Sequence, residues 1–533
     1  MSDNRSQLLR TLQINVLSNK QFLDLKNSPE GPDHTAFYLT PEVISSGEGQ
    51  SSIVSIIDMT PGNPNRAFQP RATGPTSMAM GPYTTCGVVS LANLSQGQAG
   101  AYDLITDADG NPIQVWHALA LGYGTTAAGD YSAALNRGCW AIGDASLAVN
   151  RATQAVGYET FAAGEHTRAF GRFSLSLGRY SIAGGSAYEY DEVDGSRTYK
   201  LDENGQYIPK EAIANLIAQD PENGLSSSAN LPGDCAFAFG LRSFADASYS
   251  FAGGYQSKAT NESAVALGKN TLASGYASIA LGENVKATGQ NSAAIGLGAE
   301  ATSIGSVAIG KGAKASNDGA SAFNAAIASG QFSAAFGKAT ASGNYSLAAG
   351  YNQGTIEAPK ANALGSIAFG LGTVTDGALS MAIGQECTTA VSYAFAGGMK
   401  SKVLAGATGG FAFGYNAQAQ KKYSAAFGQA AYARGEYSFA TGYYAFADYD
   451  YSCAFGKYNA QTVMNKNVLF GYGAGSSTSA RRNLFSVLAD GDVVVAKDVY
   501  SNGGKRIPVI ESGTELPDPS GYSEGDIFIL YED

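Results

Sequence analysis

Residues 263–296 read SAVALGKNTLASGYASIALGENVKATGQNSAAIG and place a glycine at every seventh position. These glycines are Gly268, Gly275, Gly282, Gly289 and Gly296. A globular core rarely needs such regularity, whereas self-similarity at a fixed period is typical of repeat architectures. The stretch therefore predicts a chain built of stacked repeats.

The true period is fourteen residues, because successive seven-residue units alternate between two different patterns. Val265 and Leu267 precede Gly268, whereas Leu272 and Ser274 precede Gly275, and the next coils repeat this contrast. An alanine lies two residues before every one of these glycines, and alternation by twos predicts short β-strands whose side chains point to opposite faces. We interpret the alanine face as a narrow interior between two sheets.

One strand of each coil is apolar on its second face as well. A strand that is apolar on both faces must be covered on both, and its own coil covers only one. The period itself therefore predicts an oligomer in which another chain covers the outward face.

The sevenfold positions between residues 118 and 185 carry glycine or asparagine, the residues that most readily adopt a left-handed backbone. This pattern predicts a corner in every half-coil. The predicted corner glycines are Gly122, Gly143, Gly157, Gly171, Gly185, Gly268, Gly282, Gly296, Gly310, Gly370, Gly384, Gly414, Gly428, Gly442 and Gly456.

The period divides the chain into five predicted segments. They are an N-terminal attachment region (1–117), a first block of coils (118–185), an insertion with a hairpin and a short helix at 210–218 (186–234), a second block (235–471) and a C-terminal β-hairpin tip (472–533). Breaks in the register predict bulged or looped-out coils around 316–335, 351–365 and 399–412. In the tip, Val493–Val495 and Val499–Tyr500 are predicted to be the strands of a hairpin. The insertion is expected either to brace the assembly or to bind a ligand.

Charge and composition exclude several kinds of partner. A net charge of −11 argues against nucleic acid, because phosphate contacts need clusters of Lys and Arg. No apolar run is long enough for a membrane-spanning helix, and the first residues show no secretory signal. Five scattered cysteines without a CxxC spacing indicate reduced thiols and no zinc site.

The repeat also resembles a known family. SVAIG (306–310), SIALG (278–282) and KATG (286–289) are similar to the head repeats of trimeric autotransporter adhesins of the YadA type. This resemblance implies an all-β fold, a left-handed parallel β-roll or solenoid in which three chains surround one axis. It covers about residues 118–471, and such rolls also occur in phage fibres.

The flanking segments favour the phage fibre over the bacterial adhesin. QFLDLKNSPEGPDHTAFYLT (21–40), LFSVLADGDVVVAKDVYSNGGKRI (484–507) and LPDPSGYSEGDIFILYED (516–533) look like segments of phage structural proteins. We therefore expect a homotrimeric virion fibre, of tail or head, assembled in the host cytoplasm. Its expected partners are other virion proteins at one end and a host-surface polysaccharide or protein. A bacterial surface adhesin and a polysaccharide-degrading tailspike are the alternatives.

The sequence offers no clear catalytic, metal or cofactor site. His34, His117 and His166 lack ligand partners at suitable spacing. Acidic residues gather in the insertion, where a tailspike could use a carboxylate pair, but DEVDG and DENG are also ordinary turn sequences. The acidic residues are Asp191, Glu192, Asp194, Asp202 and Glu203.

Tyrosines crowd the last predicted coils, from Tyr423 to Tyr458. Aromatic rings on a rigid surface lose little entropy on binding and can stack on sugars or on protein. We expect receptor contact at Tyr443, Tyr444, Tyr449 and Tyr451. The alternative is that the rings form stacked ladders that only cover thin sheets.

Overall fold

The computed structural model describes residues 72, 76–81, 84–87, 115–184, 233–463 and 467–495, and the backbone of a few short strands outside these ranges. None of the described residues lies in a helix. The chain divides into two compact units, unit 1 (residues 1–302) and unit 2 (residues 303–533). Each unit is a parallel β-solenoid of 14-residue coils, so the all-β solenoid predicted from the sequence is confirmed.

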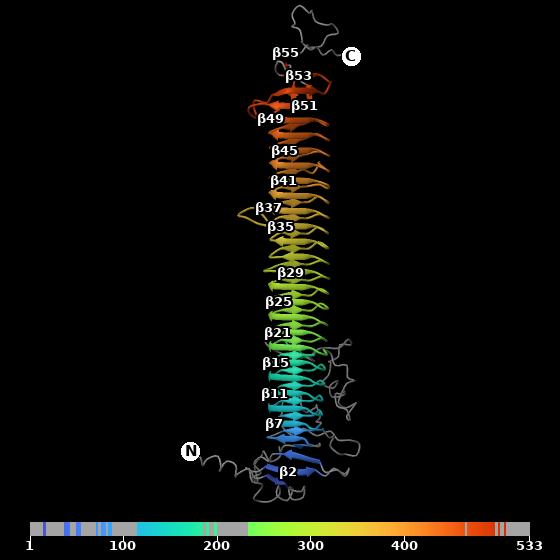
Figure 1. The fold of residues 1–533 in the computed structure, drawn as a ribbon, viewed down its shortest axis with the longest axis vertical. Helices are drawn as coiled ribbons and strands as arrows, with labels where there is room; N and C mark the ends of the chain where they lie inside the picture. The colour runs from blue at the N-terminus through green and yellow to red at the C-terminus, as the bar shows by residue number, and fades with distance from the viewer. Residues whose placement is uncertain are drawn as a thin grey trace, which may run out of the picture. The chain divides into compact units, whose positions relative to one another are not determined.

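Each coil of unit 1 contains a long strand and a two-residue strand, and the long strands from β7 to β25 follow one another in Figure 1. The long strands are β7 (Leu119–Tyr123), β9 (Ala133–Arg137), β11 (Leu147–Arg151), β13 (Phe161–Glu165), β15 (Leu175–Arg179), β19 (Phe237–Leu241), β21 (Phe251–Tyr255), β23 (Val265–Lys269), β25 (Ile279–Glu283) and β27 (Ala293–Leu297). The short strands are β8 (Thr126–Ala127), β10 (Trp140–Ala141), β12 (Gln154–Ala155), β14 (Arg168–Ala169), β16 (Ile182–Ala183), β20 (Phe244–Ala245), β22 (Lys258–Ala259), β24 (Leu272–Ala273), β26 (Lys286–Ala287) and β28 (Glu300–Ala301).

Unit 2 repeats this plan. Its long strands are β29 (Val307–Ile309), β31 (Ser321–Phe323), β33 (Ala334–Gly337), β35 (Leu347–Tyr351), β37 (Ile367–Leu371), β39 (Met381–Gln385), β41 (Phe395–Met399), β43 (Phe411–Tyr415), β45 (Ala425–Gln429), β47 (Phe439–Tyr443) and β49 (Cys453–Lys457). Its short strands are β30 (Lys314–Ala315), β32 (Ile327–Ala328), β34 (Thr340–Ala341), β36 (Lys360–Ala361), β38 (Val374–Thr375), β40 (Thr388–Thr389), β42 (Lys402–Val403), β44 (Gln418–Ala419), β46 (Tyr432–Ala433) and β48 (Phe446–Ala447). The two-residue strand β50 (Thr462–Val463) does not continue this row, because it pairs antiparallel with β51 (Lys466–Ala474).

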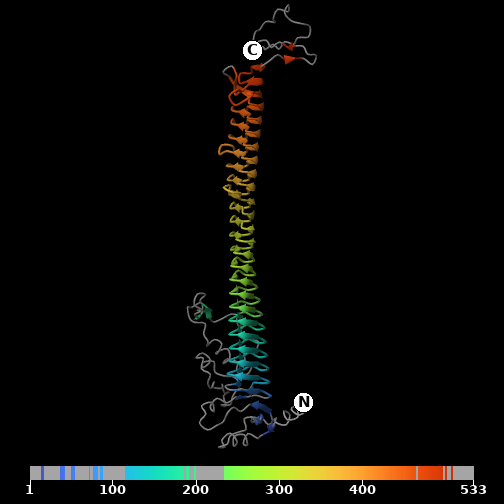
Figure 2. The same ribbon diagram turned by 90° about the vertical axis from the view of Figure 1, so that its left-hand side faces the viewer.

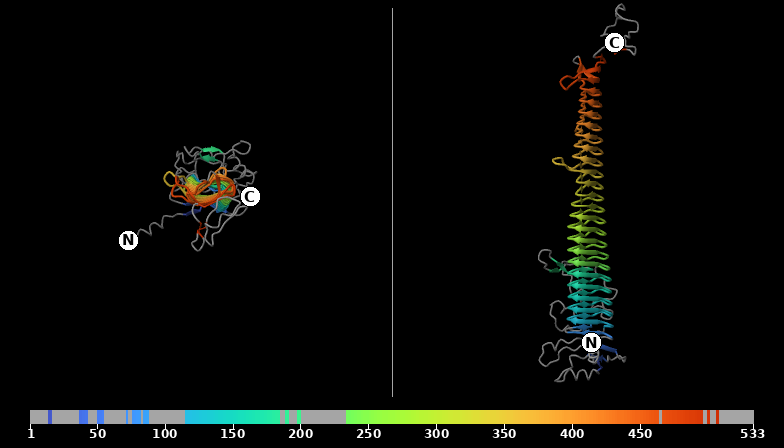
Figure 3. Two further views of the ribbon diagram at one scale, coloured as in Figure 1. Left: turned by 90° about the horizontal axis from the view of Figure 1, so that it is seen from above. Right: turned by 60° about the vertical axis from the view of Figure 1, so that its left-hand side comes forward.

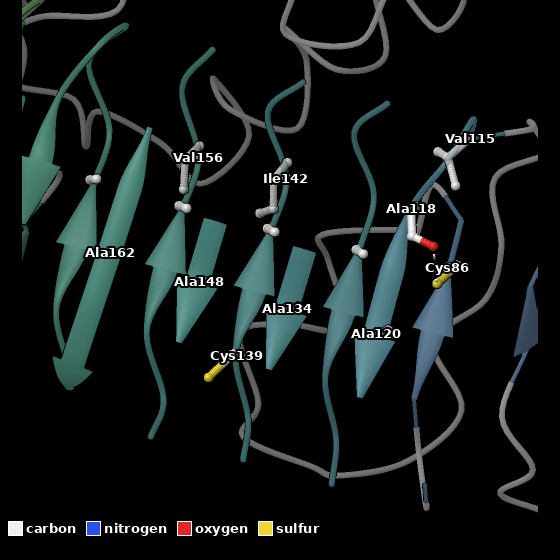
Figure 4. Close-up of a cluster of buried hydrophobic side chains, with 14 of the residues drawn as sticks. Cys86, Val115, Ala118, Ala120, Ala134, Cys139, Ile142, Ala148, Val156 and Ala162 are labelled. Carbon is white, nitrogen blue, oxygen red and sulfur yellow. Dashed lines mark hydrogen bonds between the residues drawn. The ribbon is translucent and has the colours of Figure 1, made fainter. Parts of the chain in front are cut away.

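The narrow interior consists mainly of alanine, as the sequence predicts. Ala266 and Ala280 pair in register on adjacent long strands, Ala273 and Ala287 pair on the short strands, and all four are fully buried. Figure 4 shows the same column in unit 1, with Ala120, Ala134, Ala148 and Ala162 on consecutive long strands and larger side chains such as Ile142 and Val156 beside it. Small side chains let the two sheets approach closely.

The corner glycines fall into two classes. Most lie near the end of a long strand with φ between 86° and 140°, a region that favours glycine. This class contains Gly122, Gly268, Gly282, Gly296, Gly310, Gly370, Gly384, Gly414, Gly428, Gly442 and Gly456. Asn136 and Asn150 take the same place in two coils, with φ of 86° and 90°.

The left-handed interpretation is wrong for Gly143, Gly157 and Gly171, whose φ lies outside that region. Glycine is required there because coils approach closely: a Cβ on Gly143 would lie 2.0 Å from the carbonyl oxygen of Gly157. The left-handed corner residue comes two positions later, at Ala145 and Glu159. Gly185 lies outside the described residues.

The predicted register breaks correspond to coils of unusual length. β33 and β35 start 13 residues after their predecessors, since Ala334 pairs with Ser321 and Leu347 pairs with Ala334. β37 follows β35 with Ile367 opposite Leu347, and the extra residues form a loop that projects from the stacked coils of unit 2 (Figure 3). β43 pairs Phe411 with Phe395, which adds two residues to that coil.

The insertion leaves the stacking of unit 1 intact, because β15 pairs in register with β19 across it. Its hairpin is confirmed: β17 (Tyr188–Tyr190) pairs antiparallel with β18 (Arg197–Tyr199) and is drawn beside the coils (Figure 2). The predicted helix at 210–218 falls outside the described residues.

Stacking begins upstream of residue 118. β5 (Met78–Met80) pairs in parallel with β7, and β6 (Thr85–Cys86) pairs with β8. Farther upstream, β1 (Ile14–Val16), β2 (Phe37–Glu42), β3 (Gln50–Val54) and β4 (Arg71–Ala72) add strands to the same two sheets. The sequence SMAMG (77–81) carries the repeat pattern, but the residues between it and β7 break the period. The sequence prediction therefore did not include this coil.

The C-terminal end of unit 2 changes from parallel to antiparallel pairing. β51 (Lys466–Ala474) pairs parallel with β49 and antiparallel with β52 (Asn483–Leu488), which pairs with β53 (Val493–Val495). β54 (Val499–Tyr500) pairs with β55 (Arg506–Ile507). Both predicted strands exist, but the expected pairing of Val493–Val495 with Val499–Tyr500 is wrong, because each has a different partner.

Candidate binding surface

The structure separates the four tyrosines that the sequence singles out into two groups. Tyr443 ends β47 and Tyr444 follows it, at the corner before β48. Tyr449 and Tyr451 lie after β48, at the opposite corner of the coil. The four residues therefore do not form one site.

At the corner before β48, Tyr443, Tyr444 and Tyr458 form a ring cluster with centroids 4.8 to 5.3 Å apart. Arg481, from the segment between β51 and β52, closes this corner. Its guanidinium lies 3.8 Å from the centroid of the Phe446 ring, and its Nη1 donates to the carbonyl oxygen of Tyr444 at 2.9 Å. The cluster thus packs against the C-terminal segment, and we assign it a structural role in ending the stack.

Tyr451 belongs to a different arrangement, in which it stacks on Tyr437 and Tyr437 stacks on Tyr423. The ring centroids are 5.2 Å and 5.1 Å apart, with interplanar angles of 3° and 23°. We call these three residues the tyrosine ladder. Sequence reasoning missed Tyr423 and Tyr437 as site residues, although their spacing of one coil was a usable signal.

The three tyrosines of the ladder adopt a left-handed backbone conformation, which favours glycine. Tyr423, Tyr437 and Tyr451 have φ of 53°, 56° and 58°. In other coils of unit 2 the same corner position holds Gly365 and Gly409, with φ of 59° and 71°. A bulky residue in this conformation costs about 1–2 kcal/mol, so three tyrosines here work against the intrinsic preference of the chain.

The ladder is also well exposed, with relative exposures of 56%, 50% and 72% along the series. Each ring residue is fixed by its main chain: the N–H of Tyr437 donates to the Lys422 carbonyl at 2.9 Å, and that of Tyr451 donates to the Glu436 carbonyl at 2.7 Å. The left-handed conformation itself belongs to the repeat, because other coils also place residues such as Tyr345, Leu379 and Tyr393 at this corner. What distinguishes the ladder is a row of three stacked and exposed rings, which makes it the strongest candidate binding surface of unit 2.

Charged residues accompany the ladder on its N-terminal side in each coil. Lys422, Glu436 and Asp450 directly precede the three tyrosines. A carboxylate oxygen of Asp450 accepts the backbone N–H of Glu436 at 2.7 Å and so joins two coils. The ladder thus combines ring surface and hydroxyls with carboxylate acceptors.

Carboxylates play the same joining role in unit 1. Asp130 accepts the N–H of Trp116 at 2.7 Å, and Asp144 accepts the N–H of Asp130 at 2.9 Å. Burial raises the pKa of the Asp144 carboxyl from 3.8 to about 6; the hydrogen bond from Asp130 opposes this rise and the charge of Asp130 adds to it. Because the folded-state pKa lies above the unfolded value, the protonated form of Asp144 favours the folded state. This contribution to the free energy of unfolding is complete below about pH 4 and is lost as pH rises through about 6.

Asp144→Asn removes this titration and keeps an acceptor oxygen for the Asp130 N–H. We expect the variant to unfold at a higher temperature than the wild type at about pH 8, and the difference to vanish at about pH 4. Circular dichroism melting curves of both proteins across this range measure the difference. A difference that stays constant with pH would contradict the role of Asp144.

The described histidines take part in packing. His117 stacks on Tyr131 with centroids 5.0 Å apart and contacts the hydroxyl of Thr76, and His166 stacks on Tyr180 at 5.1 Å. Within the described ranges, no three His, Cys, Asp or Glu side chains come together in a way that could hold a metal ion. His34 and the acidic residues of the insertion lie outside those ranges.

The same ranges contain no helix with the length and apolar character needed to cross a membrane.

Comparison with protein families finds a similarity for part of the repeat. The model of the YadA head domain repeat matches residues 117–135, 245–271, 259–284, 273–299, 287–313, 301–323, 405–429 and 419–445. No curated protein matches the chain. Segments similar to the YadA head domain repeat thus occur in both units, on coils whose geometry is described above.

Proposed function

We propose that this chain, which carries YadA head domain repeats, is an adhesin-like fibre protein that assembles as three copies and attaches a particle to the surface of a bacterial host. The observation that carries the proposal is the outward face of the long strands. Side chains at their first and third positions point away from the alanine interior and are mostly apolar.

In unit 2 this outward face is rich in aromatic side chains. Phe395, Phe411 and Phe427 stack with centroids 4.6 and 4.8 Å apart. On the same face Ile383 and Phe413 are 40% and 50% exposed in the single chain. Contiguous exposed apolar surface of this kind marks an interaction site, and a two-faced apolar strand requires a cover.

Unit 1 has the same property, since Ile279 is exposed on β25 and Leu281 is half-buried beside it. A face that recurs coil after coil is best covered by a partner with the same repeat, which is another copy of the chain. The number three rests on the likeness to YadA head repeats, which form trimers.

The virion is our proposed location, supported by the resemblance of residues 21–40, 484–507 and 516–533 to phage structural segments. A bacterial surface adhesin is the second candidate, supported by the YadA head repeats themselves. We propose attachment without catalysis, so release of reducing ends from host polysaccharide by the purified protein would contradict this part.

Immunogold electron microscopy with antibody to this chain tests the location. Label on thin projections of purified phage particles is the expected result. Label confined to bacterial envelopes would favour the second candidate, the bacterial surface adhesin. Binding of the purified protein to host cells then tests attachment separately. Failure to bind any host cell that the particle infects would contradict the proposed function.

A further inference from the structure

We propose that the tyrosine ladder of unit 2 is a binding surface for neutral, linear glycan chains. The inference deepens the proposed function, because it names the class of ligand through which the fibre would attach. It rests on the geometry, exposure and charge of Tyr423, Tyr437 and Tyr451.

The ladder presents two kinds of surface in one line. Tyr437 is stacked on both sides, so a ligand meets its ring edge and hydroxyl. Tyr451 is the last ring of the series and the most exposed, so a ring face is open to stacking. Tyrosine combines an apolar body with a polar tip, and a sugar ring has an apolar C–H face and hydroxyl edges that match both.

The spacing of the ladder suits a polymer better than a single small molecule. Hydroxyl-bearing rings recur 5.1 and 5.2 Å apart along three consecutive coils. Each ring is fixed by its left-handed backbone and by a main-chain hydrogen bond to the previous coil. Such a preorganised row loses little entropy when an extended chain lies along it.

Charge selects a neutral glycan. Lys422, Glu436 and Asp450 directly precede the three tyrosines, so the row carries two carboxylates and one ammonium group. The carboxylates can only accept hydrogen bonds, which sugar hydroxyls can donate, and one oxygen of Asp450 already accepts the N–H of Glu436. An acidic polysaccharide or a nucleic acid would meet these carboxylates and a chain of net charge −11. The surface is exposed and polar at its tips, whereas an apolar peptide requires a desolvated groove.

Native gel electrophoresis of the full-length protein through gels containing dextran, amylose or galactomannan tests the inference. The test variant carries Tyr423→Gly, Tyr437→Gly and Tyr451→Gly. Glycine occupies the same position at Gly365 and Gly409, so the substitutions suit the local backbone. Circular dichroism and mass in solution verify that the variant is folded and assembled.

Tyr393→Gly is the matched control. Tyr393 has the same corner position, φ of 60° and 66% exposure, but the neighbouring coils hold Leu379 and Gly409 there, so it has no ring to stack on. We expect at least one glycan to retard the wild type and the control equally. The affinity of the triple variant for that glycan should fall about tenfold or more.

Two results would overturn the inference: no retardation of the wild type by any of the three glycans, or equal retardation of the wild type and the triple variant. Binding of the same preparations to host cells separates this inference from the proposed function. If the wild type and the triple variant attach to cells equally, the inference that the ladder binds glycan is wrong, whereas the proposed attachment function is retained. If the wild type does not attach at all, the proposed function fails.

Discussion

Gly282→Ala is expected to destabilise the solenoid by more than about 3 kcal/mol, a large effect for a single methyl group. Gly282 lies in β25 with φ of 131°, and an added Cβ would lie 2.0 Å from the carbonyl oxygen of Gly296 on the next coil. Main-chain atoms cannot move away as a flexible side chain can. Accommodation of the methyl group would therefore separate two hydrogen-bonded coils.

Gly298→Ala is the matched control. Gly298 also has a positive φ, 65°, but no atom lies within 4 Å of the added Cβ. Its cost is confined to the backbone preference, about 1 kcal/mol. Chemical denaturation followed by circular dichroism measures both variants. Equal losses of stability would show that the close approach of coils is not what requires Gly282.

Ile383→Lys combined with Phe413→Lys is expected to separate the assembly into single chains. Both side chains lie on the outward face of the long strands, in β39 and β43, and are partly exposed in the single chain. The coils should therefore fold, whereas burial of two ammonium groups in an apolar contact between chains costs several kcal/mol. Light scattering of the purified variant should give the mass of one chain, 54.9 kDa.

Leu379→Lys is the control for this pair. Leu379 is exposed at the corner that the tyrosine ladder occupies in other coils, and Lys400 adopts a similar left-handed conformation elsewhere in unit 2. The assembly should survive this change. If Leu379→Lys dissociates the chains and the double variant does not, the corner rather than the long-strand face is the interface.

The coil itself could be predicted because its requirements are local and periodic. Alanines equivalent to Ala266 and Ala273 recur in most coils inside the narrow interior, and the apolar residues beside Ala266 show a second face to be covered. In other coils Ser176, Thr375, Thr389 and Val403 take these positions. The period also located the irregular coils, such as the one containing the loop between β35 and β36. Repetition turned a weak strand signal into a strong one.

The remaining features depend on partners that a period does not specify. Gly143 and Gly282 look alike in sequence, and at both positions a side chain would clash with the next coil. Only Gly282 needs a positive φ as well. Val493–Val495 has the alternation of a strand, but only the fold assigns it to β52. Tyr444 and Tyr451 are near neighbours in sequence, and the short strand β48 places them at opposite corners.

The mass of the native, full-length protein in solution tests the central claim most directly, because the apolar face of the long strands requires a cover. Sedimentation equilibrium or light scattering should give three times 54.9 kDa, independent of dilution over the accessible range. A mass of 54.9 kDa for a folded protein would contradict the account, because the outward faces of both units would then be stable in water without a partner.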